Sequence, residues 1–135
     1  MKIGFSLVLA AGLGLIAASI PVSAHHSFAA EYDTNKPVNI AGSVTKVEWI
    51  NPHARFHIDV KDANGKVANW EIELASPNGL MRNGWTRNSL KVGDMVSVVG
   101  SAAKDGSNLA NARTVTLGDG KRVFAGSSAE NPATQ

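Results

Sequence analysis

The chain contains no cysteine. No disulfide can therefore stabilise the fold, which must depend on the packing of its hydrophobic core. Two common catalytic signatures are also missing, because there is no Gly-x-Ser-x-Gly elbow and no glycine-rich phosphate loop ahead of a helix. The sequence thus gives no direct indication of a serine hydrolase or a nucleotide-dependent enzyme.

The chain also lacks a strong excess of either charge. It has 13 Lys and Arg residues against 11 Asp and Glu, and the loss of Lys2 with a cleaved leader would leave twelve against eleven. A nearly neutral chain has little electrostatic attraction for nucleic acid or for anionic membrane surfaces. We therefore expect no nucleic-acid partner.

The first 24 residues have the three parts of a secretory signal peptide. Lys2 supplies the positive start, residues 3–20 form an apolar run, and Val22-Ser23-Ala24 supplies the small residues of a cleavage site. Cleavage after Ala24 would place the mature protein in the periplasm or outside the cell, without a stable membrane anchor. An uncleaved anchor is the alternative, because the apolar run approaches the length of a membrane span.

The first part of the mature chain is predicted to contain three strands. Residues 25–37 show no clear period and are expected to form an arm. A long strand over 38–50 follows, and 55–61 alternates strictly between apolar and polar residues. The pair Asn64-Gly65 is typical of a tight hairpin turn, so residues 67–75 should return as the third strand.

The second part begins with a helix signal and continues with strands. Ser76-Pro77 combines a capping serine with proline at the first helical position. Further strands are expected over 95–99, 110–117 and 122–124, and the small, polar segment 126–135 is expected to be disordered.

This order of elements predicts a mainly β fold. Three meandering strands, one short helix and two or three further strands are typical of an OB-type barrel, in which the helix lies between strands 3 and 4. We assign residues 38–125 to such a five- or six-stranded barrel. A small open β-sandwich is the alternative.

Several segments of the mature chain carry a family resemblance. They are 25–33 (HHSFAAEYD), 48–53 (EWINPH), 90–94 (LKVGD), 103–106 (AKDG) and 110–113 (ANAR). Together they resemble a family of small exported bacterial proteins of unknown function. The resemblance implies an exported domain with no assigned cofactor and transfers no catalytic residue.

All four histidines lie early in the mature chain, at His25, His26, His53 and His57. A mature N-terminal His25 could chelate through its α-amine and its ring, and imidazole suits copper and zinc. His53 and His57 are separated by about 13 Å along a regular strand, which is too far for joint ligation. One of them could complete a site that His25 begins, if the arm folds back over the barrel. A flexible N-terminus without a metal is the alternative.

The polar face of the second and third strands is a candidate ligand surface. Its members are Arg55, His57, Asp59, Glu71 and Glu73, and Trp85 is added because it is expected to be exposed beyond the helix. Ordinary cross-strand ion pairs are the alternative explanation of this face. Trp49 and Trp70 have apolar neighbours and are expected to pack in the core.

The leading functional hypothesis is an exported, non-enzymatic module that binds a small ligand or a periplasmic protein. Its most specific form is a copper or zinc site at the mature N-terminus. A small periplasmic hydrolase or redox enzyme that uses His57, Asp59, Glu71 and Glu73 is the alternative, although nothing beside the glutamates supplies a nucleophile or an oxyanion hole.

Overall fold

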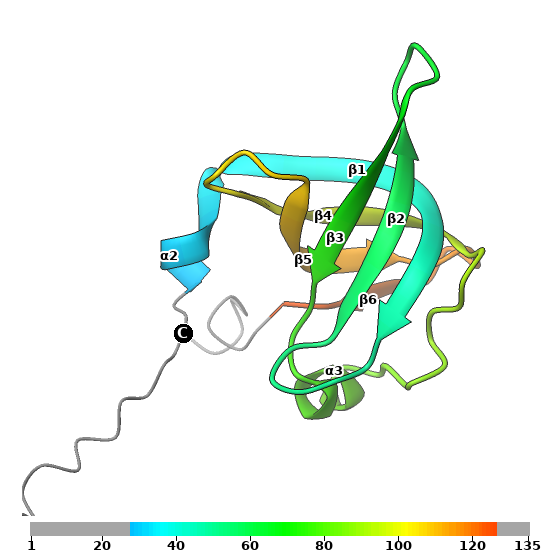
Figure 1. Cartoon of the computed structure of the whole chain (residues 1–135). Coiled ribbons are helices and arrows are strands. Elements are labelled where there is room, and N and C mark those ends of the chain that lie inside the picture. Colours follow the sequence, from blue (N-terminus) through cyan, green and yellow to red (C-terminus); the bar gives the residue numbers. More distant parts are fainter. Residues whose placement is uncertain (1–27, 127–135) are drawn as a thin grey trace, which may run out of the picture.

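The computed structural model describes residues 28–126 (Figure 1). In chain order the elements are α2 (Phe28–Glu31), β1 (Tyr32–Glu48), β2 (Arg55–Lys61), β3 (Val67–Glu73), α3 (Pro77–Arg82), β4 (Met95–Ala103), β5 (Leu109–Thr116) and β6 (Arg122–Phe124). The predicted signal peptide, His25, His26 and the predicted tail after Gly126 lie outside the described residues.

The six strands form one sheet that closes on itself. Their order is β3-β2-β1-β4-β5-β6, and the neighbours in this order are antiparallel. The sheet closes because β3 also pairs with β5, in parallel, with Glu73 opposite Asn111. A five-stranded barrel with this order and a helix between β3 and β4 confirms the predicted OB-like fold, and β6 extends it beyond β5.

Strand β1 is long because it pairs with two strands, β4 and β2. Its first part pairs with β4 and its last part pairs with β2. The strand crosses from one to the other at Gly42, where any Cβ atom would overlap the carbonyl oxygen of Asp59. Only glycine permits this close approach of two backbones.

The predicted arm is wrong in one respect, because its second half belongs to the barrel. Strand β1 begins at Tyr32 rather than at residue 38, and it skips register between Asp33 and Pro37. This irregularity breaks the alternation that would have revealed a strand. The preceding helix α2 is also attached, since the Lys104 amide donates to the Glu31 carbonyl at 2.9 Å.

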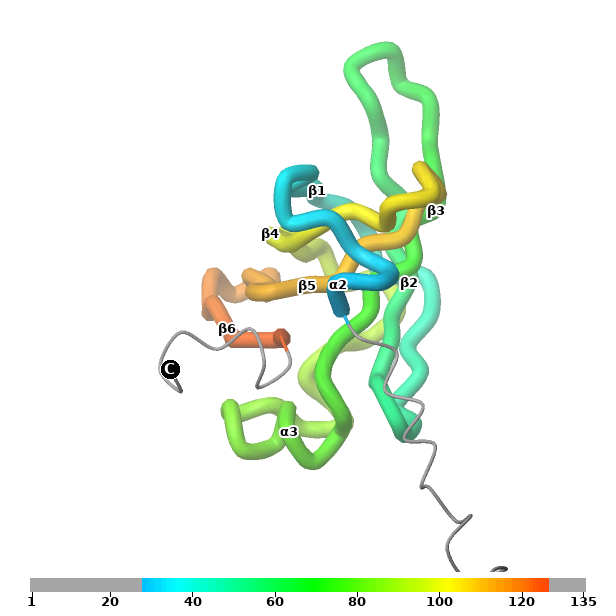
Figure 2. Tube along the Cα trace, turned by 90° about the vertical axis from the view of Figure 1, so that its left-hand side faces the viewer, coloured from blue at the N-terminus to red at the C-terminus, as the bar shows by residue number. Residues whose placement is uncertain are grey.

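Helix α3 forms at the predicted place. The Ser76 side chain accepts a hydrogen bond from the Gly79 amide at 3.2 Å, Pro77 follows at the start of the helix, and Asn83 caps its end. Leu80 is fully buried, so α3 closes one end of the barrel. The tip of the β2–β3 hairpin projects from the other end (Figures 1 and 2).

The core lies inside the barrel and follows the alternation of the strands. Its fully buried large side chains are Phe56, Ile58, Ile72, Leu80, Val44, Val98 and Val115. Trp49 and Trp70 are partly buried and pack against this core, as predicted. No helix within residues 28–126 is long and apolar enough to span a membrane.

Candidate functional site

The polar face of β2 and β3 is assembled by their register. Arg55 lies opposite Glu73, His57 opposite Glu71, and Asp59 opposite Asn69. Opposite residues of an antiparallel pair project to the same side of the sheet. The sequence therefore predicted correctly which residues share this face, but it did not predict their partners.

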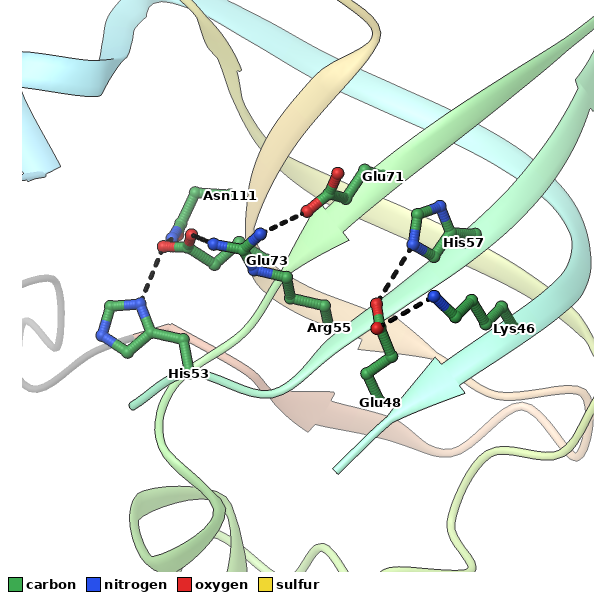
Figure 3. Close-up of polar contacts among 8 residues, drawn as sticks. All are labelled: Lys46, Glu48, His53, Arg55, His57, Glu71, Glu73 and Asn111. Atoms are coloured by element: carbon green, nitrogen blue, oxygen red, sulfur yellow. Dashed lines mark hydrogen bonds and ion pairs between the residues drawn. The ribbon is translucent and has the colours of Figure 1, made fainter. Parts of the chain in front are cut away.

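Glu73 is the centre of the largest polar group on this face. Its side chain is only 6% exposed, and its carboxylate accepts from His53 Nδ1 at 2.9 Å and from Arg55 at 3.3 Å. Asn111 Nδ2 donates to the same carboxylate at 3.4 Å, and Arg55 also reaches Glu71 at 2.7 Å (Figure 3). We call these five residues the Glu73 cluster.

Glu73 lies on the predicted polar face, but it is buried and not exposed as a candidate ligand residue on that face should be. Strand β5 closes against β3 at this residue, so Asn111 covers a position that alternation alone assigns to the surface. The closing pair joins segments 38 residues apart in the chain. Local periodicity contains no information on such a contact.

Tyr32 is a buried neighbour of the Glu73 cluster that the sequence did not single out. Its side chain is 2% exposed, and within the described residues neither its hydroxyl nor Asn111 Oδ1 has a hydrogen-bond partner. Burial, followed by the negative charges of Glu73 and Glu31, raises the pKa of Tyr32 well above its ordinary value.

The sequence contained a local signal that the segment around Tyr32 is ordered, namely the spacing of Phe28 and Tyr32. The Phe28 ring stacks on the Tyr32 ring with centroids 5.3 Å apart, and two aromatic residues four positions apart are neighbours on one turn of helix. This spacing could have indicated an ordered turn in place of an irregular arm.

The two ring nitrogens of His53 differ in their contacts, because Nδ1 bonds Glu73 and Nε2 does not. A carboxylate accepts hydrogen bonds, so His53 Nδ1 carries the hydrogen and donates it in the bond to Glu73. This leaves Nε2 as the unprotonated nitrogen of the neutral ring. The side chain is 39% exposed, so part of the ring faces solvent.

The other candidate residues of the face form separate contacts. His57 Nε2 lies 3.3 Å from Glu48, which in turn lies 2.9 Å from Lys46 (Figure 3). Hydrogen bonds from Lys46 and then His57 lower the pKa of Glu48. Asp59 accepts from Asn69 at 2.8 Å. Arg55, His57 and Asp59 therefore have different partners and do not form one charged network.

Of the four predicted metal ligands, the described residues include His53 and His57. Among residues 28–126, no three or more His, Asp or Glu side chains gather in a way that could hold a metal ion. His25 and His26 lie outside the described residues. His53 and His57 contact different carboxylates, Glu73 and Glu48, in keeping with the expectation that they do not chelate together.

Trp85 is buried, so its predicted exposure is wrong. It is 2% exposed, and its indole Nε1 donates to the Phe124 carbonyl at 2.8 Å. The indole bond joins the segment after α3 to β6, and the Trp85 amide also bonds the Leu80 carbonyl at the end of α3 at 3.0 Å. The glycine and polar residues around Trp85 form a surface loop, but the indole itself points inward.

Trp85 also lines a pocket beside the start of β2. This hollow is small, with room for about one water molecule, and it is surrounded by Val47, Trp49, Ala54, Arg55, Leu74, Trp85, Thr86, Arg87 and Leu90. The lining is mainly apolar, with guanidinium groups contributed by two arginines. The buried Trp85 ring forms part of the wall of this hollow and does not belong to the β2–β3 face.

Similarity to known proteins covers most of the chain. Among solved structures, the chain is similar to the mitochondrial single-stranded DNA binding protein Rim1 of S. cerevisiae, with 13% identity and a TM-score of 0.48 over 61% of this chain and 92% of that chain. The comparison with curated proteins gave no match. The model of DUF6152, a family of unknown function, matches residues 11–112, and the chain belongs to this family.

Proposed function

We propose that this chain is an exported, non-enzymatic binding module that holds a copper ion between its mature N-terminus and His53. The hydrogen bond between His53 Nδ1 and Glu73 carries this proposal. Histidines that bind metals usually donate their second ring N–H to a carboxylate, which fixes the ring and makes the ligating nitrogen more basic. His53 has this arrangement, with Nε2 directed away from the carboxylate.

The length of the chain supports a contribution from His25. Phe28 is the third residue after His25, so their Cα atoms are at most about 10 Å apart. Phe28 stacks on Tyr32, and Tyr32 lies close enough to Glu73 for that carboxylate to raise its pKa. The proposal requires these few residues to bring a mature N-terminus at His25 to His53.

The donor set favours copper. The α-amine and ring of His25, with His53 Nε2, would provide three nitrogen ligands, and His26 adds another imidazole. Nitrogen sites bind Cu(II) more tightly than the other divalent first-row metals, and zinc, which imidazole also suits, is the alternative. A metal binds the amine and the imidazole rings only in their deprotonated forms, so binding would release protons and weaken in acid.

The contacts of the acidic residues favour binding over catalysis. Glu71 and Glu73 are held by Arg55, and Asp59 is held by Asn69. A general acid or base needs free access to a substrate proton. On this face, such access would require the displacement of Arg55 or Asn69.

A copper titration of the mature protein tests the proposal. Protein that begins at His25 should bind one Cu(II) ion, measured by calorimetry and by the nitrogen couplings in its electron paramagnetic resonance spectrum. His25→Ala and His53→Ala should each weaken binding by about tenfold or more, and Glu73→Gln by about tenfold. His57→Ala is the matched control, because His57 also contacts a glutamate but is placed elsewhere on the face.

Two outcomes would contradict the proposal. Binding that is unchanged in both His25→Ala and His53→Ala would show that copper binds at another place. Binding that is unchanged when one extra residue precedes His25 would remove the α-amine from the ligand set. Circular dichroism of each variant checks that the barrel remains folded.

A further inference from the structure

Helix α2, at the N-terminal end of the described chain, is fixed to the barrel by Lys104. This residue directly follows β4, and its side-chain Nζ donates a hydrogen bond to the Ala29 carbonyl. Its amide donates to the Glu31 carbonyl at 2.9 Å, and the Phe28 ring adds a third contact by stacking on Tyr32. None of the α2 residues is buried, so α2 is held in place by these contacts and not by burial in the core.

The β4–β5 turn that carries this anchor, residues 104–108, is ordered by its own hydrogen bonds. Asp105 Oδ1 accepts from the Ser107 amide at 2.9 Å and from the Ser107 hydroxyl at 2.6 Å. The other end of the turn is joined to β3, because the Glu71 amide donates to the Asn108 carbonyl at 2.9 Å. One short turn therefore holds α2 at its start and, at its end, a strand that contributes to the Glu73 cluster.

We propose that Lys104 is a positioning residue for the copper site, because it fixes the point on the barrel from which the chain toward His25 departs. This inference rests on the proposed function and concerns the approach of His25, not the identity of the ligands. One ion can join His25 to His53 only if the chain between His25 and α2 is directed toward His53. A segment whose base is already fixed loses less conformational entropy when its end binds.

The length of chain before the first attachment point sets the size of the effect. Phe28, at the start of α2, is the third residue after His25, and Glu31 is the sixth. A variant without the Lys104 side chain retains only the backbone bond to Glu31, so the distance along the chain from His25 to a fixed point doubles. The effective concentration of a tethered group falls roughly as the −3/2 power of tether length, which predicts about threefold weaker copper binding.

A Cu(II) titration of Lys104 variants by calorimetry tests the proposal, on protein that begins at His25. Lys104→Met should bind copper about threefold more weakly, and Lys104→Arg, which retains a cationic donor, should recover most of this loss. Lys121→Met, at an exposed lysine of the β5–β6 turn, is the matched control and should bind copper as the wild type does. At saturating copper, Lys104→Met should show the nitrogen couplings of the wild type in its electron paramagnetic resonance spectrum, because the ligands are the same.

Two further measurements separate positioning from a general effect on the fold. In His53→Ala protein the copper no longer joins the N-terminus to the barrel, so adding Lys104→Met should not weaken binding further. Amide hydrogen exchange of residues 29–32 measures the anchor without copper, and it should be faster in Lys104→Met than in the wild type.

The outcomes distinguish this proposal from the proposed function. If wild-type protein does not bind copper through His25 and His53, both proposals fail. If that site is present, the role of Lys104 alone is overturned by copper binding in Lys104→Met that is as tight as in the wild type. It is also overturned if Lys104→Met weakens binding equally in the His53→Ala background.

Discussion

At the scale of single residues, Glu73 joins parts of the chain that are far apart. Its carboxylate contacts His53 in the β1–β2 loop, Arg55 in β2 and Asn111 in β5 (Figure 3). A buried carboxylate is tolerated only when its lost hydration is replaced by such donors. The same contacts orient His53, so one residue supports both the closure of the barrel and the proposed copper site.

Tyr32 gives a prediction for alkaline pH. Its pKa is raised above the ordinary value of 10.0, mainly by burial. The unfolded chain would ionise near pH 10 while the folded chain would not, so this contribution to stability is complete below pH 10 and is lost as the pH rises further. Tyr32→Phe should therefore unfold less readily in alkali than the wild type.

This prediction is easy to measure because Tyr32 is the only tyrosine of the chain. The ultraviolet absorbance of tyrosinate reports its ionisation, and circular dichroism reports folding. We expect the two transitions to coincide above pH 10. Ionisation of Tyr32 near pH 10 in protein that is still fully folded would contradict the assigned burial.

At the scale of elements, the helix and the β2–β3 hairpin follow from local sequence. Helix α3 begins where serine and proline predict it, and β2 spans the predicted residues 55–61. Their signals are contained in a few adjacent residues: a cap, a turn and a strict alternation. Strand β1 is different, since its start and its irregular register between Asp33 and Pro37 depend on pairing with β4.

The cap of α3 can be tested directly. Ser76→Ala removes the oxygen that accepts from the Gly79 amide and should lower the free energy of unfolding by about 1 kcal/mol. Ser76→Asp retains a capping oxygen and should restore most of the loss. Urea denaturation of the three proteins measures both effects, and equal stability of Ser76→Ala and wild type would mean that the cap contributes nothing.

At the scale of the whole molecule, the barrel depends on close approach between β4 and β5. A Cβ atom at Gly100 would overlap the Asn111 carbonyl oxygen and come within 2.9 Å of its carbonyl carbon. The register of the two strands shifts at this point, between Val99 and Gly100. Asn111 also pairs with Glu73 across the closing seam, so a disturbance here reaches the Glu73 cluster.

Gly100→Ala should therefore destabilise the barrel strongly. We expect a loss of about 3 kcal/mol, because two backbones would have to separate to admit one methyl group. Gly118→Ala is the control, since its new methyl group would meet only the Met95 carbonyl oxygen at 3.4 Å, and its effect should stay below about 0.5 kcal/mol. Thermal and urea denaturation measure both variants, and similar losses in the two would contradict the role of Gly100.

The sequence by itself determined the alternation of β2, the hairpin turn, the start of α3, the fold class and the residues that share the polar face. Each of these depends on interactions within a few residues or on the order of elements along the chain. Only the tertiary structure decided that Glu73, Tyr32 and Trp85 are buried, and which partners His53 and His57 have. The physical reason is that burial and pairing here arise from contacts between distant segments, above all the parallel closure of β3 on β5, and no local pattern encodes which segments meet.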